Sequence, residues 1–185
     1  MIIEPSFQHK IELTYIKLDI GSGDHNIKMP KEEWVHIDGC SGSNVDLVMD
    51  FFKEKLPFDN EKVDEIWLGD IIEHIPTYHY EVLKDWNRVL KIGGKIAGQT
   101  PNLHSVMMRY AKGELNIKDA ETSLYGWHDH PYQQHYVTFT IDSLTEVMKQ
   151  HGFEQGDFTK SPGYLPNNIS MCWWLCFDFC KVRSL

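Results

Sequence analysis

Short apolar runs bounded by glycine, proline or acidic residues recur along the first hundred residues. Five of these runs predict strands: residues 16–20 (IKLDI), 34–38 (WVHID), 45–50 (VDLVMD), 63–69 (VDEIWLG) and 94–100 (GKIAGQT). The runs are mostly apolar and flanked by turn residues. This pattern is typical of strands that helices cover on both faces of a parallel sheet.

A helical spacing of apolar residues lies between the fourth and fifth runs. The buried face of this helix is predicted to consist of Val82, Leu83, Trp86, Val89 and Leu90, which follow an i, i+1, i+4, i+7, i+8 pattern. Gly93 and Gly94 come soon after, and glycine favours the backbone conformation that ends helices. We therefore expect the helix to end at this pair.

A second helix is predicted over about residues 141–151. Its buried face is expected to hold Leu144, Val147 and Met148. Thr140 or Asp142 could cap its first turn through a side-chain oxygen, and Gly152 is expected to end it.

The stretches 153–158 (FEQGDF) and 170–182 (SMCWWLCFDFCKV) are predicted to form a closing pair of strands. The alternation of strands and helices indicates one α/β domain over residues 1–185, with three layers and a mostly parallel sheet that has an antiparallel closing strand. Residues 103–135 have the least regular pattern. Insertions above the carboxyl edge of such a sheet usually shape the substrate pocket, so we expect a substrate-side insertion or lid here.

The first predicted strand ends in Gly21-Ser22-Gly23. Two glycines around one small residue permit a tight turn and let a ligand approach the backbone closely. The glycine-rich fingerprint of dinucleotide-binding sites requires a third glycine at position 26, where this chain has Asn26. A nicotinamide (NAD-type) oxidoreductase is therefore an alternative function that the missing glycine counts against.

Acidic residues end the next two predicted strands. Asp38 follows Asp19 by 19 positions, and a carboxylate at that place can accept hydrogen bonds from both ribose hydroxyls of a nucleoside. Asp50 precedes Phe51 and Phe52; the carboxylate suits the exocyclic amine of adenine, and a ring can pack on the base. Because the carboxyl ends of parallel strands meet at one edge of a sheet, these residues predict a nucleoside site.

Five segments of the chain resemble, in order and spacing, the motifs of class I S-adenosylmethionine-dependent methyltransferases. They are LDIGSGD, WVHIDG, DLVMDFFKEKLPFDNEKVDEIWLGDIIEHIP, VLKIGGKIAGQTPN and HYVTFTIDSLTEVMKQHGF, and they extend over roughly residues 15–155. The resemblance implies a Rossmann-like fold, S-adenosylmethionine as cofactor, S-adenosylhomocysteine as product, and methyl transfer to a small or medium-sized acceptor. A non-catalytic module that binds S-adenosylmethionine is a further alternative.

The resemblance also implies a role for individual residues of the cofactor site. The residues expected beside the methionyl and ribose parts of the cofactor are Asp19, Gly21, Ser22 and Gly23. Asp38 would hold the ribose, Asp50 and Phe51 the adenine, and Gly69 and Asp70 would face the sulfonium and the acceptor. Carboxylates suit this ligand because the sulfonium is a cation.

Two features depart from the family pattern. Ten residues separate Gly23 from Trp34, and Pro30 lies among them. Since proline disrupts a helix interior, a full helix between the first two strands is not expected. The helix that usually precedes the first strand is also expected to be short or missing.

Histidines are the candidate general bases. An oxygen or nitrogen nucleophile is activated by a base whose pKa lies near 7, and the candidates are His74, His128 and His135. The last two belong to the stretch 126–136 (GWHDHPYQQHY), in which Trp127, Tyr132 and Tyr136 are candidate substrate contacts. Its ligand-type side chains are His128, Asp129, His130 and His135. Their spacing matches no recognisable metal motif, so no metal is predicted.

Composition limits the partners. The chain has 27 acidic and 18 basic residues, a formal charge of −9 and no basic cluster, whereas nucleic-acid binding requires a basic surface. Its longest apolar run, residues 171–177, is far shorter than the ~20 residues that span a bilayer, and the N-terminus has no signal-peptide pattern. We expect a cytoplasmic protein that acts on a small molecule without nucleic-acid or membrane partners. The oligomeric state stays open.

Three cysteines near the C-terminus, Cys172, Cys176 and Cys180, are four positions apart. In a strand, neighbouring members of this series would be about 13 Å apart, which is too far for a disulfide or a shared metal. We expect buried free thiols.

Overall fold

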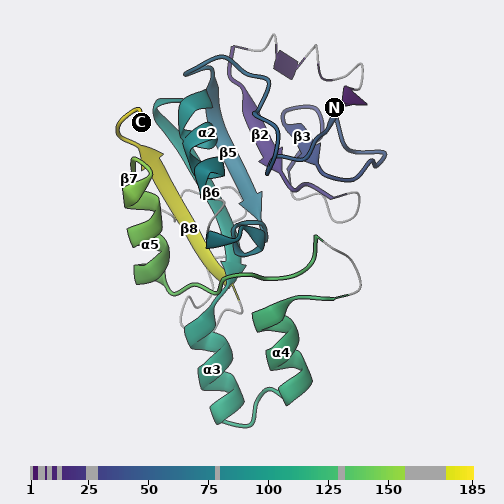
Figure 1. The fold of residues 1–185 in the computed structure, drawn as a ribbon, viewed down its shortest axis with the longest axis vertical. Helices are drawn as coiled ribbons and strands as arrows, with labels where there is room; N and C mark the ends of the chain where they lie inside the picture. The colour runs from purple at the N-terminus through teal and green to yellow at the C-terminus, as the bar shows by residue number, and fades with distance from the viewer. Residues whose placement is uncertain are drawn as a thin grey trace.

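A single sheet runs through the centre of the molecule (Figure 1). The computed structural model describes residues 2–3, 7, 10–11, 14–23, 29–77, 80–128, 132–156 and 174–185. Within these residues the strands are β1 (Ile2–Ile3), β2 (Lys17–Ile20), β3 (Val35–Asp38), β4 (Leu47–Val48), β5 (Val63–Gly69), β6 (Leu90–Pro101), β7 (Phe153–Gln155) and β8 (Trp174–Lys181). The sheet order is β1-β4-β3-β2-β5-β6-β8-β7.

The strand directions confirm the predicted fold class. Strands β4, β3, β2, β5 and β6 are parallel to their neighbours within this set, and β8 closes the sheet antiparallel to both β6 and β7. The two-residue strand β1, which the sequence pattern did not predict, adds an antiparallel edge beside β4. The carboxyl ends of the five parallel strands therefore meet at one edge.

Helix α2 (Glu81–Val89) confirms the predicted apolar face, because the four expected core residues that it contains are buried; the fifth, Leu90, is also buried but begins β6. The predicted end of the helix is wrong. The chain leaves the helix at Leu90, which has an extended conformation, and Gly93 and Gly94 lie inside β6. Pairing between β5 and β6 shifts register at this point, and Gly93 has a φ of +78°, so the glycines accommodate an irregularity in the strand instead of capping the helix.

Helix α5 (Ile141–Gln150) lies where the second helix was predicted and contacts β7 and β8. Thr140, rather than Asp142, caps it: Thr140 and Ser143 form a reciprocal capping box. Leu144 and Met148 are buried as expected, whereas Val147 is only partly buried.

Residues 103–135 are more regular than the sequence pattern suggested. They contain helices α3 (Leu103–Ala111) and α4 (Ile117–Tyr125), each begun by an asparagine cap, Asn102 and Asn116. A small apolar cluster of Val106, Leu115, Ala120 and Leu124 holds the pair together. Figure 1 shows both helices beyond the tips of β5 and β6, on the carboxyl edge where an insertion was expected.

The two unusual regions are described only in part. Phe7, Lys10 and Ile11 have helical conformation, and the residues between Phe7 and Lys10 lie outside the described part of the chain. Residues 29–34 form turns, and residues 24–28 lie outside the described part of the chain.

The main core surrounds the centre of the sheet. Trp86 of α2 is fully buried there with the aromatic rings of Phe153, Phe177 and Phe179. Cys176 and Cys180 are free thiols within the described residues, as expected, but both are only partly buried, so the expectation that they are buried is wrong. Cys172 lies outside the described residues. No helix in the described ranges is long and apolar enough to cross a membrane.

Candidate functional site

A pocket of about 610 Å³ opens at the carboxyl edge of the parallel strands. The residues around it come from five segments: Gly21 after β2; Asp38 at the end of β3, with Gly39 and Cys40 after it; Met49, Asp50, Phe51 and Phe52 after β4; Asp70, Ile71 and His74 after β5; and Tyr132 and Gln133 from the insertion. This is the place where open α/β sheets bind ligands, and the volume is within the range of small-molecule sites. Five predicted cofactor residues meet here, namely Gly21, Asp38, Asp50, Phe51 and Asp70.

The turn after β2 explains the two glycines of the sequence motif. Gly21 has a φ of +71° and Gly23 a φ of +61°, both in the left-handed region that glycine tolerates. A Cβ atom on Gly21 would lie only 1.8 Å from Cδ1 of Ile71. The backbone N–H groups of Gly21 and Ser22 both donate to the carbonyl of Ile37, at 2.8 and 3.2 Å. The turn must therefore be tight, so that its N–H groups reach the β3 carbonyl, and it must lack a side chain at position 21, where Ile71 packs.

Asp38, at the end of β3, ties this turn to the next loop. Its Oδ2 accepts a hydrogen bond from the Gly23 N–H at 2.8 Å, and its Oδ1 accepts one from the Cys40 N–H at 2.8 Å. A carboxylate has about four acceptor positions, so each oxygen can accept a further bond from a ligand hydroxyl.

The loop after β4 places a carboxylate beside two aromatic rings. Asp50 Oδ1 accepts from the Phe52 N–H at 3.1 Å, and Asp50 Oδ2 accepts from Lys53 Nζ at 2.7 Å. The ring centroids of Phe51 and Phe52 are 4.8 Å apart. Together these groups offer an acceptor and an apolar surface of the size of a nucleobase.

Asp70 has an unusual backbone. Its φ is +59°, in the left-handed region that costs non-glycine residues energy and that asparagine and aspartate tolerate best. Its N–H donates to the Gln99 carbonyl at 2.9 Å, and its Oδ2 accepts from Gln99 Nε2 at 2.7 Å. Both bonds fix the carboxylate at the pocket wall. Gly69, which precedes it, ends β5 and is not among the described lining residues.

Two of the three candidate histidines lie side by side. The His74 and His135 ring centroids are 4.7 Å apart in an edge-to-face arrangement. Burial lowers the pKa of His74 below its usual value; burial, followed by the neighbouring His74, lowers the pKa of His135 to about 4. Of the two, His74 lines the pocket.

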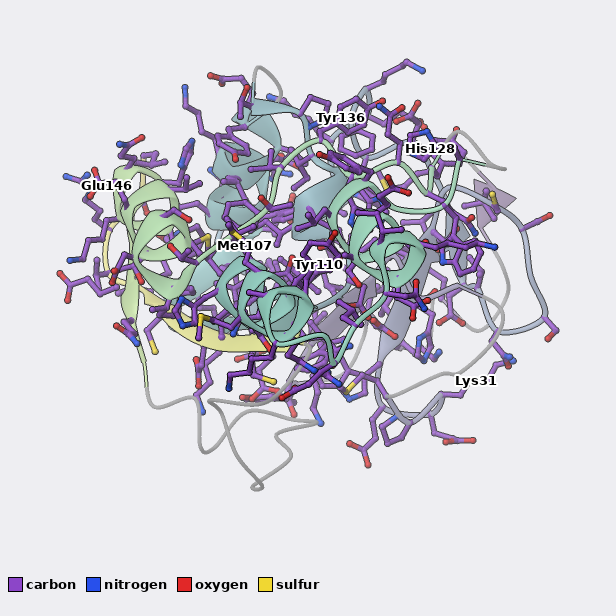
Figure 2. The ribbon with its side chains drawn as sticks, turned by 90° about the horizontal axis from the view of Figure 1, so that it is seen from below. Lys31, Met107, Tyr110, His128, Tyr136 and Glu146 are labelled. Atoms are coloured by element: carbon purple, nitrogen blue, oxygen red, sulfur yellow. The ribbon has the colours of Figure 1, made fainter. Side chains whose placement is uncertain are left out.

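His128 is exposed, its Nε2–H donates to the Tyr125 carbonyl at 3.0 Å, and it is not part of the described pocket wall. Figure 2 shows His128 and Tyr136 from the side of α3 and α4. Trp127 and Tyr136 are largely exposed, and of the three aromatic candidates Tyr132 alone is among the lining residues described.

Asp19 occupies a different environment from the one expected. It is buried at 3% exposure, and its Oδ2 lies 3.0 Å from Nδ1 of His36, its partner in the β2–β3 register. Asp46 accepts from the His36 N–H and pairs with the buried Lys10. Asp19, Ser22 and Gly23 are absent from the described lining. Asp19 therefore belongs to a buried polar network with His36, Asp46 and Lys10.

Several lining residues had no sequence signal of their own. Ile71, Met49, Gly39, Cys40 and Gln133 reach the pocket, although the sequence analysis assigned none of them a role in the site. The first four directly follow or flank strand ends that the hydrophobic pattern did locate, so position after a strand was the available signal.

A family model described as a methyltransferase domain matches residues 12–155 of the chain. Solved methyltransferases have the same fold at low sequence identity. 1,6-Didemethyltoxoflavin-N1-methyltransferase of Burkholderia thailandensis, solved with 1,6-didemethyltoxoflavin and S-adenosylhomocysteine, is 14% identical with a TM-score of 0.60 over 97% of this chain and 80% of that one. A methyltransferase of Methanosarcina mazei, described as S-adenosylmethionine-dependent, is 14% identical with a TM-score of 0.57 over 98% and 99%. No curated protein matches the chain.

Proposed function

This chain belongs to the methyltransferase domain family, whose cofactor is S-adenosylmethionine, and on this basis we propose that it catalyses methyl transfer to a small or medium-sized acceptor. The observation that carries the proposal is the pocket at the carboxyl edge, bordered by the Gly21 turn and by two carboxylates at successive strand ends, Asp38 and Asp50. The NAD-type alternative is not favoured, because the family and the solved structures described above are methyltransferases.

The residues present fit the nucleoside part of the cofactor. Asp38 has acceptor capacity for ribose hydroxyls after its two backbone bonds are counted. Asp50 offers an acceptor to the exocyclic amine of adenine, and Phe51 and Phe52 offer an apolar surface beside it. The bare turn at Gly21 leaves backbone atoms at the wall, where a side chain would meet Ile71.

The acceptor would enter at the opposite end of the pocket. When bound, the cofactor supplies a methyl group already activated on a sulfonium sulfur. The protein must then align the acceptor and exclude water. Asp70 and His74, which line the pocket after β5, would border the sulfonium and the acceptor. Gly69 directly precedes Asp70 at the end of β5, and the Tyr132 ring lies 3.7 Å from the Cβ position of Gly39, beside the nucleoside end of the pocket.

His74 is the strongest of the candidate bases. It lines the pocket, and its lowered pKa keeps the imidazole neutral near pH 7, so that it can accept a proton from an acceptor hydroxyl or amine. His135 contacts His74 from the insertion side. His128 is exposed and bonds to the backbone of α4, which leaves it without a role in this proposal.

Calorimetric titration with S-adenosylhomocysteine tests the cofactor site. A hydrogen bond to a charged group is worth about 1.5–3 kcal/mol, so Asp38→Ala is expected to weaken binding about 10- to 100-fold, and Asp38→Asn less. Asp59→Ala, which changes an exposed acid outside the pocket wall, is the matched control and should bind like the wild type. Unchanged affinity of a folded Asp38→Ala variant would refute the ribose role.

Activity is tested separately, by the release of S-adenosylhomocysteine from S-adenosylmethionine in the presence of a panel of hydroxyl, amine and carboxylate acceptors. Release that depends on an acceptor supports methyl transfer. Tight cofactor binding without release on a broad panel would favour the non-catalytic module.

A further inference from the structure

Three side chains with metal-ligating atoms gather beside the pocket. One such atom from each of Glu73, His74 and His135, a carboxylate oxygen or a ring nitrogen, lies within 4.8 Å of the other two. Glu73 and His74 belong to the 3-10 helix η1 (Ile72–His74) after β5, whereas His135 belongs to the segment that returns from the insertion. We propose that these three residues bind one divalent transition-metal ion of the zinc type.

The hydrogen bonds of both imidazoles fix the tautomer that a metal requires. A carbonyl oxygen can only accept, so His74 Nδ1–H donates to the Gln134 carbonyl at 2.9 Å, and His135 Nδ1–H donates to the Ser123 carbonyl at 3.1 Å. The lone pair of each neutral ring is then on Nε2. Metal-binding histidines commonly use their other nitrogen in this way, because the outer bond orients the ring and raises the basicity of the ligand.

The carboxylate is oriented by a partner of its own. Glu73 is 1% exposed, and its Oε2 accepts from the fully buried Thr100 hydroxyl at 3.0 Å. A buried carboxylate carries a charge that is costly to desolvate, and a divalent cation between the three side chains would stabilise it further. Two imidazoles and one carboxylate form a ligand set typical of zinc sites that keep an open coordination position.

Backbone bonds hold the two halves of the site together. The Tyr136 and Val137 N–H groups both donate to the Glu73 carbonyl, at 2.9 and 3.3 Å. Ligands of one tetrahedral zinc are about 3.4 Å apart, given zinc–ligand bonds of about 2.0–2.2 Å, so chelation requires only modest side-chain rotation. Because His74 lines the pocket, the open coordination position would lie next to the acceptor end.

The proposed metal site differs from the group of ligand-type side chains within the stretch 126–136 that the sequence analysis considered. The histidine-rich stretch groups His135 with neighbours in sequence, and two of these, Asp129 and His130, lie outside the described residues. The structure instead groups His135 with His74 and Glu73, which lie 61 and 62 positions earlier. An imidazole whose Nε2 coordinates a metal cannot accept a proton there, so His74 acts either as a metal ligand or as a general base.

Metal binding can be measured without any turnover. Protein treated with a chelator and then dialysed against Zn²⁺ is expected to take up one ion per chain, and Co²⁺ in its place should give the visible absorption of a low-coordinate nitrogen- and oxygen-ligated site. His135→Gln and Glu73→Gln should weaken Zn²⁺ binding about 100-fold or more, and Thr100→Val, which removes only the outer hydroxyl, about tenfold. His104→Ala, a change at an exposed histidine of α3, is the control and should bind normally.

Circular dichroism of each variant separates lost binding from lost folding. If a ligand variant fails to fold, Thr100→Val, which is nearly isosteric, still tests the site through its effect on Zn²⁺ affinity. Two results would overturn the proposal: wild-type protein that takes up no Zn²⁺ at micromolar concentration, or uptake that is equal in the wild type and in the folded ligand variants. Titration with S-adenosylhomocysteine in the presence of a chelator tests the cofactor site independently, so failure of one proposal is distinguishable from failure of the other.

Discussion

The contact between Gly21 and Ile71 can be tested by adding a single methyl group. In Gly21→Ala, the new Cβ would lie 1.8 Å from Cδ1 and 2.2 Å from Cγ1 of Ile71. Real atoms do not approach so closely, so either Ile71 moves into the pocket that it lines or the turn opens. Gly113→Ala is a matched control, because Gly113 has nearly the same φ (+72° against +71°) but nothing within 4 Å of its Cβ position.

The control separates backbone strain from collision. A left-handed alanine costs about 1–2 kcal/mol, less about 0.4–1 kcal/mol from the smaller entropy of the unfolded chain, so Gly113→Ala should lose about 1 kcal/mol. Overpacking typically adds about 1–3 kcal/mol, so Gly21→Ala should lose about 2–4 kcal/mol. Ile71→Ala removes both colliding atoms and leaves only Cβ, which is at an ordinary 3.6 Å. The double variant should therefore recover about 1–3 kcal/mol relative to the sum of the single changes.

Urea denaturation measures all four variants, with the free energy of unfolding taken by linear extrapolation at constant m-value. Binding of S-adenosylhomocysteine supplies a second readout, because a displaced Ile71 would fill part of the pocket. Equal losses for Gly21→Ala and Gly113→Ala, together with additive behaviour of Gly21→Ala and Ile71→Ala, would show that the close contact does not constrain the turn.

Three further predictions concern charged groups. Asp70→Ala should lose about 1–2 kcal/mol of stability in urea because alanine lacks the acceptor and tolerates the positive φ poorly, whereas Asp70→Asn should lose under about 0.5 kcal/mol; equal losses would contradict this account. In chelator, unfolded His135 gains its proton near pH 6.5 and folded His135 only near pH 4. The free energy of unfolding should therefore fall by about 1–2 kcal/mol as the pH is lowered from 6.5 to 4, once solvent screening is allowed for. His135→Gln should flatten this dependence of stability on pH. Lys10→Met should cost about 3 kcal/mol by leaving the buried Asp46 without its cation; a loss under about 1 kcal/mol would show that the pair is unimportant.

The pocket was largely predictable because one geometric rule links sequence to site. Parallel strands have their carboxyl ends at a common edge, so locating β2, β3, β4 and β5 in the hydrophobic pattern also locates the residues after them. Asp38 and Asp50 reached the pocket for this reason. Ile71 occupies an equivalent position after β5, but its contact with Gly21 depends on how β2 and β5 pair. The local sequence does not specify that pairing.

Strand register explains the surroundings of Asp19. The motif puts Asp19 near the turn, and the sequence alone gives no reason to pair it with a particular residue of β3. In the sheet, Asp19 lies directly beside His36, and both side chains are buried. Their pairing joins the carboxylate to the buried network that includes Asp46 and Lys10. A shift of one residue in strand pairing would reverse the face that each side chain occupies, so such a contact needs the folded register.

The pairing of His74 with His135 depends on a longer connection. The insertion leaves the sheet after β6, forms α3 and α4, and returns across η1, where backbone groups of residues 134–137 bond to Glu73 and to the His74 ring. Only this return brings Tyr132 and Gln133 to the pocket wall. Any ligand that holds His135 against His74 would therefore also hold the return segment, and with it Tyr132 and Gln133, at the pocket wall. The same bonds make the insertion part of the site, because a loosened return segment would remove one wall of the pocket and one candidate metal ligand together.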